Sequence, residues 1–160
     1  MMNQIMKMRK AKGFTLVELL IVIIIIGILA GMLLLAVRSA TDKAEATKIV
    51  NALRNYKSAS LMYYTDHSVW PGTTDNWTDS LDMYVDRSID AKSFSQVVVA
   101  AVGDRFLIGL KSAAGSPLEQ AGVQGKLADQ AQSSALYDDQ GVYFAGGTPN
   151  ATTEVYTNMR

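Results

Sequence analysis

The chain begins with a short basic stretch and then becomes almost purely apolar for the length of a membrane-spanning helix. Between Phe14 and Val37 the only charged residue is Glu18. A helix rises about 1.5 Å per residue, so a run of this length can cross a hydrocarbon core of about 30 Å. The pattern therefore predicts a lipid-compatible helix over 14–37, with a single carboxylate near its start.

The apolar positions change their spacing after Val37, but the pattern stays helical. Polar side chains now fill one arc, and no proline occurs before Pro71. We expect 38–65 to be an amphipathic continuation of the same helix, about 50 residues in all, with one face packed on a sheet. The apolar positions that recur every three or four residues are Ala46, Ile49, Val50, Leu53, Tyr56, Leu61 and Tyr64.

The remaining residues, 66–160, favour β-structure. Two β-branched runs, 94–102 and 105–110, flank Gly103-Asp104 and predict a hairpin. We expect two further strands at 141–144 and 154–157 joined by the loop 145–153, and short helices near 79–85 and 126–132. The predicted fold class is α+β, one long N-terminal helix packed on an antiparallel sheet of about four strands.

The charges around the apolar run predict its orientation. Four cations precede the run (Lys7, Arg9, Lys10 and Lys12). This bias places the N-terminus in the cytoplasm and the rest outside. An ordinary secretory signal would carry a small-residue cleavage pattern, which is not found near Ala30 or Ala36. A plain signal-anchor helix remains open, but it does not account for Glu18.

Composition narrows the chemistry. The chain has 15 cations and 15 anions, so removing 1–13 with its four cations leaves 11 against 15, a net charge of −4, which argues against an intrinsic nucleic-acid site. There is no cysteine, so the C-terminal segment must be held by packing or by neighbours. His67 is the only histidine, which excludes zinc sites with two histidine ligands. We expect no enzyme activity and no cofactor, because neither a G-x-G-x-x-G motif nor a P-loop occurs. We expect no metal either, because the acidic loops match no EF-hand spacing, although calcium binding there stays open (Asp75, Asp79, Asp82, Asp138 and Asp139).

The stretch Gly13-Phe14-Thr15-Leu16-Val17-Glu18 resembles the class III signal of type IV prepilins and type II secretion pseudopilins. The resemblance implies that 1–13 is a leader, cut after Gly13 by a membrane peptidase that then N-methylates Phe14. It implies that 14–37 is retained as the filament core and that the fold is the pilin fold. The turn from Tyr63 to Pro71, with an aromatic residue before the proline, also looks like this family.

Two interpretations of Glu18 remain open. In the first, the new Phe14 amine and Glu18 pair within one chain, about one helical turn apart, and simply satisfy the helix start. In the second, Glu18 accepts the Phe14 amine of a neighbouring subunit, which relieves part of the cost of a carboxylate in lipid, about 2.5–3.5 kcal/mol. The resemblance implies that Gly27 and Gly31 mark a stretch that can lose helicity in a filament, where each glycine already costs the helix about 1 kcal/mol. The alternative is that the two glycines allow close packing of helices.

The sequence thus predicts a structural subunit of a type IV pilus. A type II secretion pseudopilin or a competence pilin is the alternative, and a single-pass membrane-anchored binding or sensor domain is the rival of a different class. The resemblance implies a helical homopolymer as partner, together with the prepilin peptidase and an inner-membrane assembly platform. It also implies an inner-membrane location before assembly and an extracellular pilus afterwards.

Overall fold

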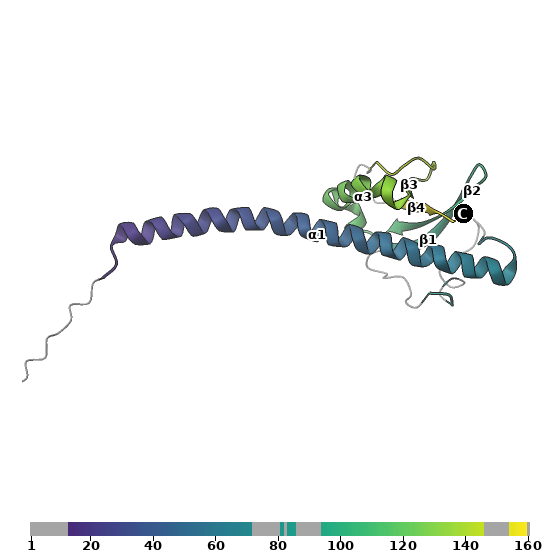
Figure 1. The fold of residues 1–160 in the computed structure, drawn as a ribbon, viewed down its shortest axis with the longest axis horizontal. Coiled ribbons are helices and arrows are strands. Elements are labelled where there is room, and N and C mark those ends of the chain that lie inside the picture. Colours follow the sequence, from purple (N-terminus) through teal and green to yellow (C-terminus); the bar gives the residue numbers. More distant parts are fainter. Residues whose placement is uncertain (1–12, 72–80, 82, 86–93, 146–153, 160) are drawn as a thin grey trace, which may run out of the picture. The chain divides into compact units, whose positions relative to one another are not determined.

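The computed structural model describes residues 13–71, 81, 83–85, 94–145 and 154–159. The chain divides into two compact units, Met1–Arg38 and Ser39–Arg160. The elements are α1 (Leu16–His67), β1 (Phe94–Val102), β2 (Arg105–Ser112), the 3-10 turn η1 (Pro117–Glu119), α3 (Ala121–Ser134), β3 (Leu136–Tyr137) and β4 (Glu154–Asn158) (Figure 1).

The first half of α1 is apolar on all sides and contacts no core. The large apolar side chains from Phe14 to Val37 are between 47% and 87% exposed. An 18-residue window of α1 reaches a mean hydropathy of 3.3 with none of it buried, so the helix is long and apolar enough to cross a membrane. The predicted single helix of about 50 residues is confirmed, because α1 runs unbroken for 52 residues.

The second half of α1 is amphipathic and contributes one face to the core of the second unit. Its buried residues are Ala46, Ile49, Val50, Leu53, Tyr56, Ala59 and Ser60. They cluster with apolar residues of the sheet, of η1 and of α3. Two predicted core positions were wrong, since Leu61 and Tyr64 are 43% and 40% exposed. Near the end of α1 the aromatic side chains pack on each other instead, and Tyr64 stacks on Trp70 at 4.5 Å between ring centroids.

The sheet has four strands in the order β1-β2-β4-β3, and every neighbouring pair is antiparallel. The α+β fold with one long helix and a four-stranded antiparallel sheet is therefore confirmed. The predicted hairpin is also confirmed, with β2 two residues longer than expected, and Gly103 takes the positive φ of 63° that its turn requires.

β4 lies between β2 and β3, and the Met159 N–H donates to the Phe106 carbonyl at 2.8 Å. The C-terminal strand is thus held by pairing and packing.

The two faces of the sheet differ in what covers them. Ile108, Leu110 and Val155 belong to the core that contains α1, so they mark the inner face. Side chains alternate along a strand, so Leu107, Gly109 and Tyr156 mark the opposite face, which we call the outer face. Strand pairing places Val102 of β1 on this outer face as well.

The predicted strand at 141–144 was wrong. The strand at this point is β3, directly after α3, and Tyr143 forms only an isolated bridge to Tyr137. The side chain of Asp138 explains the difference, because its Oδ1 accepts from the backbone N–H groups of Gln140 and Val142 at 3.0 and 2.9 Å. These bonds fold residues 138–142 into a turn instead of a strand. The predicted loop 145–153 lies outside the described residues except for residue 145. Of the predicted helix 79–85, residue 81 is helical, whereas 83–85 form a turn and a bend and not a helix. The predicted strand at 154–157 is confirmed as β4.

The helix α3 is longer than predicted, beginning five residues before 126. It ends where Ala135 adopts a left-handed conformation with φ 51°, and β3 follows at once. At its other end the Asp42 carboxylate of α1 lies against Gly122, in the first turn of α3. A Cβ on Gly122 would lie 2.7 Å from the Asp42 carboxyl carbon. An acid at a helix N-terminus is favourable, so this contact helps to attach α3 to α1.

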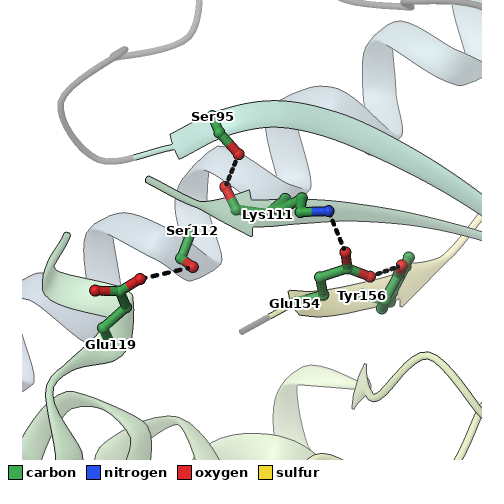
Figure 2. A network of polar contacts seen from close by, with 6 residues as sticks. All are labelled: Ser95, Lys111, Ser112, Glu119, Glu154 and Tyr156. Carbon is green, nitrogen blue, oxygen red and sulfur yellow. Dashed lines mark hydrogen bonds and ion pairs between the residues drawn. The ribbon is translucent and has the colours of Figure 1, made fainter. Parts of the chain in front are cut away.

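A polar network crosses the outer face from β2 to β4 (Figure 2). Glu154 accepts a hydrogen bond from the Tyr156 hydroxyl and forms an ion pair with Lys111 at 3.3 Å between Oε1 and Nζ. Burial, and then the hydrogen bond to Glu154, hold the pKa of Tyr156 above its usual range. The Tyr156 ring lies directly over Gly109, where a Cβ would be 2.8 Å from the ring Cγ.

Gly109→Ala should therefore destabilise the second unit. The added methyl group would displace a buried ring, and overpacking of this kind costs about 1–3 kcal/mol. Thermal unfolding of the full chain in detergent, followed by near-ultraviolet circular dichroism, would measure the change. Gly125→Ala in α3 is the matched control, because its Cβ would meet nothing within 4 Å and should stabilise the helix by up to about 1 kcal/mol. Equal behaviour of the two variants would contradict the role of Gly109.

Candidate functional site

The candidate site lies at the start of α1. Residues 13–15 precede the helix, and Phe14 is 87% exposed. A Cβ on Gly13 would meet nothing within 4 Å. The Gly13–Phe14 peptide bond is therefore open to a second protein, and no packing within the described residues requires a glycine at this position.

Thr15 and Glu18 form a reciprocal cap on α1. The Thr15 backbone N–H and the Thr15 hydroxyl both donate to Glu18 Oε2 at 2.8 Å. The Glu18 backbone N–H donates to Thr15 Oγ1 at 3.2 Å. This arrangement is a capping box, which satisfies two backbone N–H groups that a helix start leaves without partners. It fixes the Glu18 carboxylate beside the exposed Gly13–Phe14 bond.

The sequence analysis did not predict that Thr15 caps the helix. The signal was present, because a threonine three residues before a glutamate at the start of an apolar run is the pattern of a capping box.

The capping box occupies only part of the Glu18 carboxylate. An ionised carboxylate offers about four lone-pair positions on two oxygens. Both donors from Thr15 reach Oε2, and within residues 13–71 no hydrogen-bond partner contacts Oε1. The side chain can therefore keep its cap and still accept a cation.

Gly27 and Gly31 lie within the unbroken part of α1. A Cβ at either position would meet nothing within 4 Å, so packing inside this chain does not require a glycine. Their predicted roles in helix flexibility or helix packing thus concern contacts with other chains, and both roles stay predictions.

The other candidate residues do not assemble into a second site. His67 ends α1 and stacks on Tyr63 with 4.2 Å between ring centroids. Among the described residues no group of three or more His, Cys, Asp or Glu side chains is arranged to hold a metal ion. The acidic residues Asp75, Asp79 and Asp82 lie outside the described residues, and Asp138 instead holds its own turn.

A family model described as "Prokaryotic N-terminal methylation motif" matches residues 8–34, which include the Gly13–Phe14 bond and the capping box. The motif and the apolar helix behind it define a prepilin-type N-terminal segment. The predicted resemblance to type IV pilins and type II secretion pseudopilins is thereby confirmed for this segment.

Similar proteins include a fimbrial protein, a type IV major pilin and a type II secretion protein. The fimbrial protein EcpC of Eikenella corrodens is 36% identical over 97 residues, which cover 61% of this chain and 60% of that protein. The type IV major pilin protein PilE of Neisseria gonorrhoeae is 45% identical over 60 residues, or 38% of this chain and 36% of that protein. The type II secretion system core protein G of Vibrio cholerae is 40% identical over 75 residues, or 47% of this chain and 51% of that protein.

The similarity covers only part of each protein. The matched regions span between 36% and 60% of the length of these three relatives. Among solved structures, the major type IV pilin PilA1 from Clostridium difficile matches 76% of this chain and 98% of that chain, with a TM-score of 0.49 and 16% identity.

Proposed function

We propose that this chain is a structural subunit of a type IV pilus, and that it assembles through the first half of α1 after its leader is removed. One observation carries the proposal. A helix that is apolar on all sides and unburied begins at a capping box, directly after an exposed Gly-Phe bond. The similarity to fimbrial proteins and to a type IV major pilin supports it.

The first step is processing at the cytoplasmic face of the membrane. A prepilin peptidase cuts between Gly13 and Phe14 and releases 1–13. The new Phe14 amine is cationic at neutral pH, and N-methylation leaves it so. The cut therefore creates a positive charge on Phe14, four residues before Glu18, which is about one helical turn.

The second step is docking of a neighbour. The Phe14 amine of an incoming subunit binds Oε1 of Glu18 in a subunit already in the filament, while Thr15 keeps its bonds to Oε2. Before docking, a carboxylate in the membrane costs about 2.5–3.5 kcal/mol. Pairing with an ammonium relieves part of this cost, and so it gives the incoming subunit a preferred depth and register.

The third step is transfer of the apolar half of α1 from lipid to the filament core. In lipid its side chains need no protein partner, since the hydrocarbon is as apolar as they are. In an external filament each large apolar side chain left in water would cost about 1.5–3 kcal/mol. Copies of the same helix must therefore cover one another, which makes residues 14–37 the core of a homopolymer.

A type II secretion pseudopilin is the second candidate, favoured by the similarity to core protein G. It would use the same processing and the same Glu18 pair in a short filament that stays in the cell envelope. The two candidates differ in where the assembled chain is found.

Shearing of intact cells tests the proposal. The chain should be an abundant component of the released surface fibres and should be absent from them when the prepilin peptidase is deleted. Recovery only from the envelope, in a processed form, would favour the pseudopilin. An unprocessed chain confined to the membrane would contradict both candidates and favour an anchored binding or sensor domain.

A further inference from the structure

One flank of the second half of α1 carries positive charge that no acid in the described part of the chain neutralises. Lys43, Arg54 and Lys57 lie along one strip of the helix, because separations of 11 and 3 residues are close to whole turns at about 3.6 residues each. Lys43 and Arg54 are exposed, and none of the three forms an ion pair with a described residue. Leu61, two turns beyond Arg54, adds an exposed apolar side chain. We call these four residues the basic flank.

The opposite charge gathers where two turns meet on the other side of the sheet. Asp104 lies in the turn between β1 and β2, and Asp138 and Asp139 lie in the turn after β3. The turn after β3 lies against the end of β1, directly before the β1–β2 turn, because a Cβ on Gly141 would be 3.2 Å from Cγ1 of Val102. We call Asp104, Asp138, Asp139, Val142 and Tyr143 the acidic corner.

The acidic corner has the composition of a contact surface. Asp104 and Asp139 are exposed, and Val142 and Tyr143 are 62% and 47% exposed. The exposed Arg105 beside them offsets one of the three carboxylates, so the corner remains negative. Tyrosine is enriched at the centres of protein interfaces. The Tyr143 ring stacks on Tyr137 with 5.1 Å between ring centroids.

The two surfaces lie on different layers of the same unit. α1 packs on the inner face of the sheet, whereas the acidic corner lies against Val102 and Leu107 on the outer face. Two copies that join a basic flank to an acidic corner therefore make a head-to-tail contact. One copy keeps its acidic corner free and the other keeps its basic flank free, so the pair can bind a further copy at either end. Repetition of such a contact gives an open filament if the rotation does not close a ring.

We propose that the basic flank of one copy docks on the acidic corner of a second copy, as a contact between neighbouring second units in the filament. This inference rests on the proposed function, since it supplies a contact that the apolar half of α1 does not make. Complementary charge sets which surfaces meet and suppresses wrong registers, and the exposed Leu61, Val142 and Tyr143 provide apolar area at the same contact.

Charge reversal of whole surfaces tests the proposal in the full chain, expressed as the sole pilin. The basic-flank variant is Lys43→Glu with Arg54→Glu, and the acidic-corner variant is Asp104→Lys with Asp139→Lys; all four side chains are exposed, so neither variant should unfold the chain. Each variant should lower the amount of sheared fibre at least about tenfold, because attraction becomes repulsion. The chain that carries all four substitutions reverses both sides of every contact and should recover to within about threefold of wild type.

The matched control reverses two exposed charges outside both surfaces. Lys48→Glu with Asp129→Lys changes two residues whose ion pairs are local, since Lys48 pairs with Glu45 and Asp129 with Lys126, each three residues away on the same helix. Total processed subunit in the membrane is measured for every variant, so that loss of fibre is separated from loss of protein. The control should assemble as the wild type does.

Three results would overturn the docking contact. They are normal fibre from either reversed surface, failure of the four-fold variant to recover, and an equal loss in the control. Loss with the basic-flank variant alone would also overturn it and would assign that flank to a different anionic partner. Failure of the proposed function is a separate result, since wild-type chain would then be missing from the fibres.

Discussion

Glu18→Ala should give a subunit that is processed normally and accumulates in the membrane but forms few fibres. The substitution removes the only charge of the apolar run and with it the acceptor for the Phe14 amine of a neighbour. Relief of even half of the cost of a carboxylate in lipid, about 1.4 kcal/mol, is a factor of about ten in an equilibrium constant. We therefore expect at least about a tenfold loss of sheared fibre, measured against total processed subunit in a strain that lacks other pilins.

Two further variants separate the charge of Glu18 from its role as a cap. A glutamine at this position can still complete a capping box, so Glu18→Gln removes the charge and keeps the cap. It should fail as severely as Glu18→Ala. Thr15→Ala removes the hydroxyl that bonds the carboxylate and should have the smaller effect. If Glu18→Gln assembles as the wild type does, the intersubunit ion pair is wrong and Glu18 serves only as a helix cap.

Gly13→Leu should block processing almost completely and thereby abolish the fibres. The new side chain would meet open space in this chain, so any effect must arise in the peptidase. A residue without Cβ lets a backbone approach closely, as a narrow cleavage site requires. The retained leader is measured as a slower band in gel electrophoresis of the membrane fraction. Gly13→Ala, with the smallest possible side chain, should keep part of the processing, and efficient cleavage of Gly13→Leu would contradict the assignment of this bond.

The long helix and the hairpin could be predicted, because the structure that the local sequence favours is also the one that the surrounding protein or lipid favours. The unbroken apolar run, the spacing of Ile49, Leu53 and Tyr56 and the glycine of the β1–β2 turn each have one favourable structure. The pattern failed where side chains override it. Val142, Tyr143 and Phe144 have the composition of a strand, but Asp138 binds two backbone N–H groups of the same segment and turns the chain. Leu61 kept the helical spacing but is exposed, although Tyr63, two residues further along α1, packs against the core. Leu61 lies on the flank of the helix that carries Arg54, which the core does not cover.

The sequence identified the chemical group at the candidate site, but it did not show which hydrogen bonds that group makes. A lone carboxylate in an apolar run identifies Glu18 from sequence, because such a residue is costly unless it has a role. The sequence does not show how the two carboxylate oxygens are used. In the structure Thr15 donates to one of them, and the other is left to accept a cation. The acidic corner could not be found from sequence, because Asp104 and Asp139 come together only when the turn after β3 folds over the outer face of the sheet.

The mass of the N-terminal peptide in purified surface fibres tests the central claim most directly. The account predicts that the chain in fibres begins at Phe14 and carries one N-methyl group, with no peptide from residues 1–13. A chain in fibres that retains the leader, or a processed chain that never enters a fibre, would contradict assembly through a freshly exposed N-terminus.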